Sequence, residues 1–196
     1  MPPPDRTSFP GGVQARESRP RVVVLVGLMG VGKTTVGKSL ARRLHWNFVD
    51  SDHEIQLRTG VSIPTIFEIE GEAGFRRRES AVLQELCGKP KTVLATGGGA
   101  VLDPLNRKLL HDSAFVTYLS ASANLLWERT RHDRNRPLLQ VADPLAKLTE
   151  LRTQRHPLYQ ETAHLEVDVV LVDLRLHPHF TELDVDLVLL GFALLL

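Results

Sequence analysis

The chain has 196 residues, of which 42% are hydrophobic and 24% charged, as expected for a globular protein with one α/β domain. Its formal net charge of +1 provides no electrostatic footprint for nucleic acid, so we expect no nucleic-acid partner. Cys87 is the only cysteine, which excludes an internal disulfide, fits a reducing cytosol and favours a small buried helix residue over a reactive thiol. Because no apolar segment reaches the length of about 18 residues that a membrane span needs, we expect a cytoplasmic protein.

Residues 1–20 contain five prolines, two adjacent glycines and several charges, with little apolar content. Such a segment cannot bury enough surface to offset its ordering entropy, so it is predicted to be a disordered N-terminal extension. The alternative is a transit peptide, but the triple proline and the acidic Asp5 and Glu17 argue against it.

A glycine-rich motif, Gly-Leu-Met-Gly-Val-Gly-Lys-Thr at 27–34, follows an apolar run at 21–26 and precedes a helical pattern at 35–44. A strand, this motif and a helix form the context of a P-loop, in which backbone N–H groups surround phosphate oxygens at a helix N-terminus. Lys33 would reach the β- and γ-phosphates, and the Thr34 hydroxyl would bind Mg²⁺. The alternative, a chance glycine turn, does not explain both flanks, so the motif predicts a nucleoside triphosphate site.

The rest of the chain alternates predicted strands and helices. The strands are predicted at 46–50, 92–96, 114–119 and 164–169. The helices are predicted at 51–58, 63–69, 72–87, 122–131 and 144–155, with a further helix that opens at 103–104 and a short turn at 157–163. This alternation predicts a parallel sheet covered by helices on both faces. Ligands of such folds bind at the carboxyl ends of the strands, where the P-loop, 50–52 and 97–99 would meet.

Asp50 and Asp52 lie two residues apart at the end of the second predicted strand. In extended backbone, residues two apart share a face, so both carboxylates could point into the crevice. One could serve Mg²⁺ while the other orients a hydroxyl or accepts its proton. The alternative is that one of them only caps the helix that begins near Ser51.

Two further stretches have residue types suited to an anionic ligand. Arg76, Arg77 and Arg78 are consecutive in a predicted helix; Arg77 is expected to be solvated, and composition alone does not separate Arg76 from Arg78 as a carboxylate ligand. Three glycines at 97–99 after a buried strand indicate positive φ or a close approach, and we favour close approach of a ligand.

The segment 129–142 is polar and rich in arginine, which is typical of a lid that closes over transferring phosphates. A solvated surface loop is the alternative.

Six motifs together closely resemble the shikimate kinases. They are Gly-Leu-Met-Gly-Val-Gly-Lys-Thr-Thr at 27–35, Asp-Ser-Asp at 50–52, Ile-Phe-Glu-Ile-Glu-Gly-Glu at 66–72 running into Phe-Arg-Arg-Arg-Glu at 75–79, Gly-Gly-Gly-Ala-Val at 97–101, Arg-Pro-Leu-Leu at 136–139 and Arg-His-Pro-Leu-Tyr at 155–159. Their order and spacing agree over roughly 21–168. The resemblance implies a three-layer P-loop kinase fold of the nucleoside-monophosphate-kinase type, with a five-stranded parallel sheet flanked by helices. It also implies ATP-dependent phosphorylation of the shikimate 3-hydroxyl, a step of chorismate and aromatic amino acid biosynthesis.

The same resemblance assigns roles to individual residues. It implies catalytic roles for Lys33, Asp52 and Arg136, and it favours Arg76 over Arg78, with Glu79 as the partner that orients Arg76. The ATP site implied is Gly30, Val31, Gly32, Lys33, Thr34, Thr35, Arg129 and Arg136; the shikimate site is Asp52, Arg76, Gly98 and Arg155; and the Mg²⁺ ligands are Thr34 and Asp50. Arg129 would stack on adenine.

The C-terminal part departs from the family pattern. In place of a polar loop and an amphipathic helix, 169–178 is largely apolar and 187–196 consists almost entirely of apolar residues. This tail could pack on the domain, mediate association or lie against a bilayer. We therefore divide the chain into the extension 1–20, a kinase domain 21–175 with its lid at about 129–142, and an atypical apolar tail 176–196, and we expect a monomer.

Two other functions remain open at the level of sequence. One is a kinase for another small hydroxy acid such as gluconate, and the other is a non-catalytic ATP-binding paralogue. The first is disfavoured by the match of both Arg76 and Arg155 to the carboxylate pocket of the family.

Overall fold

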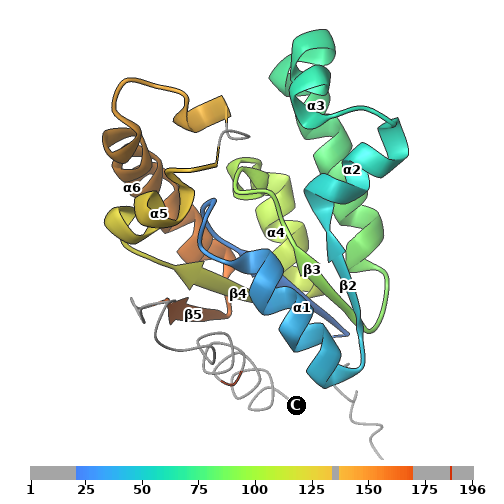
Figure 1. The fold of residues 1–196 in the computed structure, drawn as a ribbon. Helices are drawn as coiled ribbons and strands as arrows, with labels where there is room; N and C mark the ends of the chain where they lie inside the picture. The colour runs from blue at the N-terminus through green and yellow to red at the C-terminus, as the bar shows by residue number, and fades with distance from the viewer. Residues whose placement is uncertain (1–20, 134–136, 170–185, 187–196) are drawn as a thin grey trace, which may run out of the picture.

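The structure is a computed structural model that describes residues 21–133, 137–169 and 186 (Figure 1). The predicted extension 1–20, Arg136 and, apart from Asp186, the predicted tail 176–196 lie outside the described residues.

Five parallel strands form one sheet in the order β2-β3-β1-β4-β5. Their bounds are β1 (Val22–Val26), β2 (Asn47–Asp50), β3 (Thr92–Ala95), β4 (Phe115–Ser120) and β5 (Leu165–Asp168). β1 is central and buried along its whole length, with Val24 opposite Leu94 of β3 and Val116 of β4. An unalternating apolar strand of this kind needs cover on both faces. The predicted five-stranded parallel sheet is confirmed.

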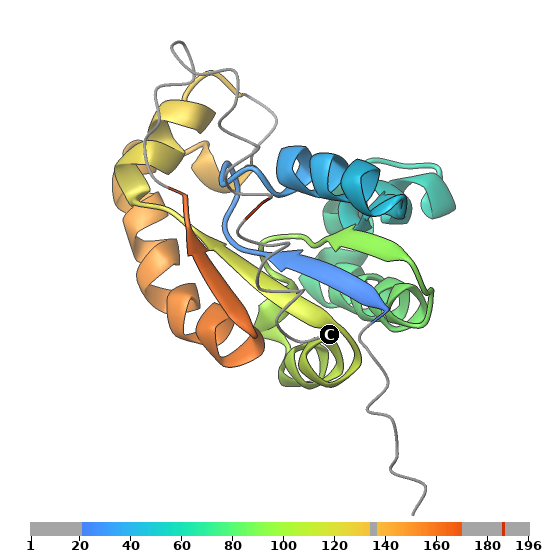
Figure 2. The same cartoon turned by 90° about the horizontal axis from the view of Figure 1, so that it is seen from below.

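Helices provide that cover in two layers. They are α1 (Lys33–Leu44), α2 (Ser51–Thr59), α3 (Ile63–Cys87), α4 (Pro104–Ser113), α5 (Ala123–Thr130) and α6 (Pro144–Thr162), with 3₁₀ turns η1 (Ala100–Leu102) and η2 (Pro137–Leu139). Figure 2 shows α1 on one face of the sheet and α4 on the other, where α4 packs between α3 and α6. This arrangement places every β-to-α turn at the same edge of the sheet.

Local capping chemistry sets where these helices begin. The side chains of Ser62, Asp103, Ser122 and Asp143 each accept a hydrogen bond from a backbone N–H in the first turn of α3, α4, α5 and α6. Gly60 ends α2 in the left-handed conformation, with φ 71°. These starts and this end were all predicted from sequence.

The two helices predicted at 63–69 and 72–87 form one bent helix, α3. The bend is at Gly71, whose φ of 68° and ψ of −178° lie outside the helical region. This backbone conformation is open to glycine almost alone. The bend separates a largely exposed arm at 63–70, in which Ile66 is buried, from the rest of the helix, whose buried residues run from Gly74 to Cys87. Cys87 is buried, as predicted, and burial raises the pKa of its thiol to about 11.

The prediction that the last long helix ends near Arg155 is wrong. α6 continues through Pro157 to Thr162. A proline inside a helix loses one backbone hydrogen bond and crowds the preceding turn. Residues beyond it, Tyr159 and Thr162, are completely buried, and their packing stabilises the continued helix.

The bend at Gly71 leads to a stability prediction. Gly71→Ala forces a side chain into a strained backbone conformation, which costs about 1–3 kcal/mol, so the melting temperature should fall by several degrees. No atom lies within 4 Å of the added Cβ, so only backbone strain is tested. The control is Gly88→Ala at the C-terminal end of α3, where φ is −83° and the atom nearest to the added Cβ, the Glu85 carbonyl oxygen, is 3.3 Å away, so the melting temperature should change much less. Equal melting temperatures for the two variants, measured by circular dichroism, would contradict the role of Gly71.

Candidate active site

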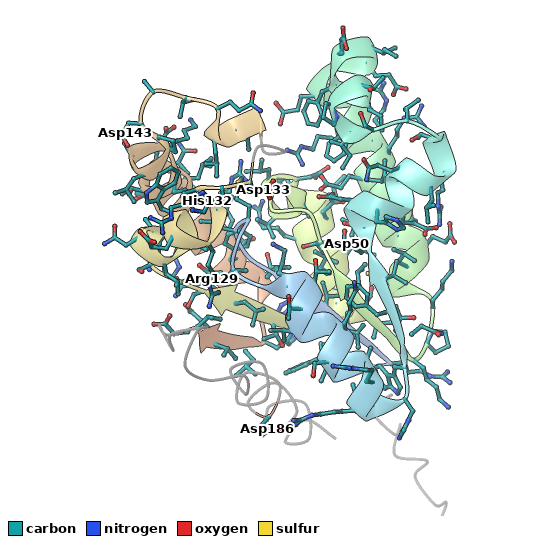
Figure 3. The ribbon with its side chains drawn as sticks, in the orientation of Figure 1. Asp50, Arg129, His132, Asp133, Asp143 and Asp186 are labelled. Carbon is teal, nitrogen blue, oxygen red and sulfur yellow. The ribbon has the colours of Figure 1, made fainter. Side chains whose placement is uncertain are left out.

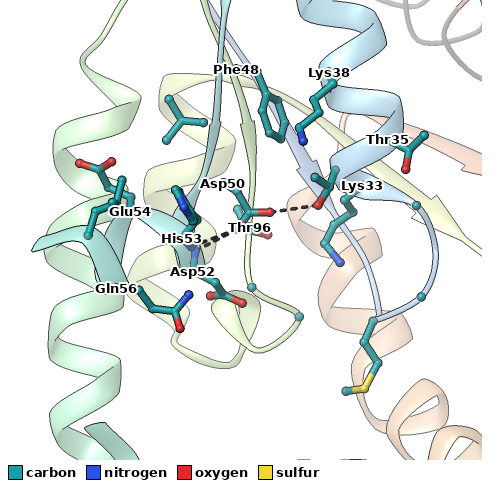
Figure 4. A pocket seen from close by; sticks show the side chains of 18 residues that line it. Lys33, Thr35, Lys38, Phe48, Asp50, Asp52, His53, Glu54, Gln56 and Thr96 are labelled. Carbon is teal, nitrogen blue, oxygen red and sulfur yellow. Dashed lines mark hydrogen bonds between the residues drawn. The ribbon is translucent and has the colours of Figure 1, made fainter. Parts of the chain in front are cut away.

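A cavity of about 840 Å³ lies where the carboxyl ends of β1, β2 and β3 meet. Its walls come from the P-loop, the start of α1, the segment 48–57 and residues 96–98. Figure 4 shows Asp50 and Asp52 extending from one wall and Lys33 from the opposite wall. The three loops predicted to meet at this edge of the sheet are therefore together.

The P-loop has the backbone shape that its glycines suggest. Gly30 and Gly32 have φ values of 81° and 104°, and Gly32 immediately precedes the first turn of α1. Nζ of Lys33 donates hydrogen bonds to the carbonyl oxygens of Gly27 and Leu28, at 2.8 and 3.0 Å. The ammonium group therefore lies inside the loop, beside the positive end of α1. Thr34 and Thr35 are exposed in the first turn of α1 and line the cavity.

Asp50 has two structural tasks at once. Its Oδ1 atom caps α2 by accepting from the backbone N–H groups of Asp52 and His53, and its Oδ2 atom accepts from the Thr34 hydroxyl at 3.0 Å. The helix-cap alternative is thus correct for Asp50, and the capping leaves one oxygen directed at Thr34. The extended-backbone argument for Asp52 is wrong because the strand ends at Asp50 and Asp52 lies in the first turn of α2. Both carboxylates nevertheless line the cavity.

Asp52 is half-buried, and its carboxylate lies in an unfavourable environment. Burial, followed by repulsion from Asp50, raises its pKa above the usual range, while Lys33 and Arg76 act in the opposite direction. Its Oδ1 atom is buried without a hydrogen-bond partner among the described residues. A buried acceptor without a partner is costly and suggests a group that bonds to a ligand.

Arg76 and Arg78 point to different partners, which separates them. Arg76 donates to Glu79, with a distance of 2.6 Å from Nη1 to Oε2, and also to Glu72. Arg78 instead pairs with Glu70 on an exposed face. Glu79 is completely buried, and burial raises its pKa while Arg76 lowers it. Arg77 is exposed, as predicted.

The three glycines at 97–99 serve close approach, and none of them has a positive φ. A Cβ on Gly99 would lie 2.5 Å from the guanidinium of Arg76, and one on Gly97 would lie 2.6 Å from Oδ1 of Asp52 and 2.9 Å from Oε1 of Glu79. Gly98 has more room, since a Cβ there would meet nothing closer than 3.6 Å. The groups that approach Gly97 and Gly99 are the charged side chains of the site itself.

Residues that sequence reasoning missed hold this glycine loop in place. The Ser51 hydroxyl accepts from the Gly97 N–H at 3.1 Å, and the Tyr159 hydroxyl donates to the Gly98 carbonyl at 2.6 Å. Arg155 donates to the same carbonyl at 3.1 Å. The one available signal for Tyr159 is its position four residues after Arg155, on the same face of a helix.

Arg129 lies on the opposite side of the P-loop. Its guanidinium donates to the carbonyl of Val31 at 3.2 Å, and the neighbouring Thr130 packs against Gly30. Figure 3 shows Arg129 at the end of α5, with His132 and Asp133 of the predicted lid following it. Of that lid, 129–133 and 137–142 are described and Arg136 is not.

Comparison with known proteins is consistent with this geometry. The model of the family described as shikimate kinase matches residues 29–172. A shikimate kinase from Dechloromonas aromatica (strain RCB) is 64% identical over 148 residues, which cover 76% of this chain and 81% of that protein. The chain belongs to the shikimate kinase family. Its activity is that of this family, an ATP-dependent phosphotransferase.

Solved structures agree with this assignment. Shikimate kinase from Acinetobacter baumannii in complex with shikimate has a TM-score of 0.79 and 46% identity, covering 87% of this chain and 94% of that one. A gluconokinase from Sinorhizobium meliloti 1021 has a TM-score of 0.53 and 18% identity, covering 90% of this chain and 94% of the other, and shows a similarity of fold alone. In the described part of the chain, no helix has the length and apolar character needed to cross a membrane.

The environment of Asp52 predicts that its ionised carboxylate lowers the stability of the folded protein. A carboxyl group with a raised pKa binds its proton more tightly in the folded state, so stability is lost as the pH rises from the ordinary aspartate pKa of 3.8 through the folded pKa. Asp52→Asn mimics the protonated form and should melt a few degrees above the parent at pH 7.5, with a difference that shrinks toward pH 4.5.

Asp112→Asn is the control for this measurement. Asp112 is an exposed aspartate whose pKa is lowered by Lys108, so its replacement should not raise the melting temperature at either pH. A lower melting temperature for Asp52→Asn at pH 7.5 would contradict the proposed electrostatic cost.

Proposed function

We propose that this chain transfers the γ-phosphoryl group of ATP to the 3-hydroxyl of shikimate, giving shikimate 3-phosphate and ADP. The observation that carries the proposal is the convergence of a P-loop, a half-buried aspartate and two arginines on the glycine loop at 97–99. The P-loop suits a nucleotide, and the aspartate with the two arginines suits a small acid with hydroxyl groups. The reaction belongs to chorismate and aromatic amino acid biosynthesis.

On the nucleotide side, the P-loop residues 30–35 bind the phosphates and Arg129 borders the nucleotide. The depth of Lys33 within the loop, 2.8 Å from the Gly27 carbonyl, supports its contact with the β- and γ-phosphates. Arg136 is proposed to reach the phosphates from the lid.

Thr34 and Asp50 are the proposed ligands for Mg²⁺. Their oxygens lie 3.0 Å apart beside the P-loop, and hard oxygen donors of this kind fit a magnesium ion that also binds phosphates. When bound, Mg²⁺ supplies positive charge that offsets the negative charge developing on the transferred group. Thr34 and Asp50 would hold it on the side of the cavity next to Lys33.

On the acceptor side, the chemistry of the residues matches shikimate, a small ring with one carboxylate and three hydroxyls. Arg76 and Arg155 are proposed to bind the carboxylate, because a guanidinium can hold both of its oxygens. Nε of Arg155 is buried without a partner among the described residues, and it is therefore available to a ligand. Gly98 is proposed to contact shikimate through its backbone, between α3 with Arg76 and α6 with Arg155.

Asp52 is proposed to align the reacting hydroxyl and accept its proton. Its partnerless buried Oδ1 atom provides an acceptor, and its raised pKa brings it closer to the range useful for a base. The remaining catalysis is positioning and charge neutralisation by Lys33 and Arg136, since phosphoryl transfer requires little covalent participation of the protein.

Gluconate is the alternative acceptor, because a gluconokinase shares the fold. Nothing in that similarity concerns the acceptor pocket. The pair of arginines favours shikimate, whose rigid ring presents a carboxylate and a hydroxyl at a fixed separation.

The proposal extends to the organisation of the chain. We assign the enzyme domain to 21–175, with the lid at about 129–142, and we propose that the protein acts as a monomer in the cytoplasm. The extension 1–20 and the tail 176–196 are assigned no part in the reaction.

An assay of ADP release with ATP, Mg²⁺ and shikimate tests the function. We expect release that depends on shikimate and is absent with gluconate. Asp52→Asn should lower turnover by about 10²-fold or more while the KM for ATP stays the same, because only alignment and proton transfer are removed. Release with gluconate alone would assign the other acceptor, and no release from folded protein would indicate an ATP-binding paralogue. Unchanged turnover of Asp52→Asn would refute the role of Asp52.

The assignment of Arg76 can be tested against its neighbour. Arg76→Lys keeps a positive charge beside buried Glu79 but loses the planar fork, so the KM for shikimate should rise about tenfold or more. Arg78→Lys is the matched control, since Arg78 pairs with Glu70 at the surface, and both KM values should remain those of the parent. If both variants keep the parental KM for shikimate, the carboxylate site has been placed wrongly.

A further inference from the structure

The carbonyl oxygen of Gly98 accepts two hydrogen bonds from one helix. The Tyr159 hydroxyl donates at 2.6 Å and Nη1 of Arg155 donates at 3.1 Å. A carbonyl oxygen has two lone pairs, so these donors use both. Because Arg155 and Tyr159 are four residues apart on α6, they reach the same point from consecutive turns of the helix.

Tyr159 is buried in the core in an orientation that directs its hydroxyl to the Gly98 carbonyl. Its side chain is completely buried, and its ring stacks on that of Tyr118, with 4.9 Å between the centroids. The hydroxyl of Tyr118 is engaged elsewhere, at 3.1 Å from Nδ1 of His156. Burial raises the pKa of the Tyr159 phenol, so the hydroxyl remains a neutral donor.

The peptide group that Tyr159 holds lies where the P-loop and Arg155 come close together. A Cβ on Gly98 would lie 3.6 Å from the Gly27 carbonyl oxygen and 3.7 Å from the Met29 nitrogen, and on its other side 3.8 Å from Nη1 of Arg155. Gly98 thus lies between the P-loop and the arginine proposed to bind the carboxylate. Because a peptide unit is planar, fixing the Gly98 carbonyl fixes the whole plane between Gly98 and Gly99.

We propose that Tyr159 is a positioning residue for the phosphoryl acceptor, acting through the Gly98 carbonyl and the guanidinium of Arg155. This rests on the proposed function, in which Arg155 binds the carboxylate of shikimate. With Tyr159 occupying one lone pair, Arg155 contacts the carbonyl through one nitrogen and keeps its buried Nε for the ligand. Without the hydroxyl, the peptide plane can rotate and Arg155 can turn toward the vacated lone pair.

Two phenylalanine variants of the full-length chain test the proposal. Tyr159→Phe and Tyr118→Phe each delete one buried hydroxyl from the same stacked pair and leave the ring volume intact. We expect Tyr159→Phe to raise the KM for shikimate about tenfold, with a smaller change in kcat and an unchanged KM for ATP. We expect Tyr118→Phe to leave both KM values as they are.

Melting temperatures measured alongside separate positioning from a purely structural role. A structural role would lower the melting temperature of both variants and shift the KM for shikimate in neither, or in both alike. Either of those results, or a KM for shikimate within about twofold of the parent in Tyr159→Phe, would overturn the proposal. An equal rise in the KM for ATP would also overturn it, because the effect would then extend to the nucleotide side.

Arg155→Lys distinguishes a failure of this inference from a failure of the proposed function. If Arg155→Lys does not change the KM for shikimate, the acceptor site itself is wrongly assigned. If it raises that KM while Tyr159→Phe does not, the function stands and only the role of Tyr159 fails. In the double variant the two effects should combine to much less than their product, because Tyr159 acts through Arg155.

Discussion

The site depends on one buried ion pair, that between Glu79 and Arg76. Glu79 is completely buried on α3, and a carboxylate in that position is tolerated only with a charged partner at hydrogen-bonding distance, here 2.6 Å away. The pair needs space, which Gly99 supplies by having no side chain next to the Arg76 guanidinium. Gly97 does the same for Asp52 and Glu79. The glycine loop is therefore shaped around the charged side chains of the site.

Some polar atoms of these charged side chains have no hydrogen-bond partner, and their positions are informative. One oxygen each of Asp52 and Glu79 and Nε of Arg155 are buried without partners among the described residues. All three border the glycine loop or contact it through another atom of the same side chain. Oγ1 of Thr117 on β4 is a further buried atom without a partner among the described residues. Three such atoms around one loop nevertheless indicate that a ligand, rather than the fold, completes the hydrogen bonding there.

Most of the fold could be predicted because its signals are local. An apolar run before the P-loop, Ser or Asp before a helix and Gly60 after one all act within a few residues, and the strands lie where those patterns predicted. One error concerns long-range packing, because α6 passes Pro157 where Tyr159 is buried against Tyr118. The other is a local choice between strand and helix, because Asp50 ends the strand as a cap and so places Asp52 on a helix. Arg76 and Arg78 could not be separated by composition, since their different partners follow from the bend at Gly71 and the burial of Glu79.

One helix links the predicted lid to the proposed acceptor side of the cavity. α6 begins directly after the lid segment, is capped there by Asp143, and packs against η2, where Leu139 enters the core. Three turns later the same helix presents Arg155 and Tyr159 to Gly98. Since a helix is stiff along its axis, the anchor of the lid and the donors to the glycine loop belong to one body. Continuation of the helix through Pro157 is what preserves this link, because a helix ending at Arg155 would leave Tyr159 without a fixed relation to the segment predicted to form the lid.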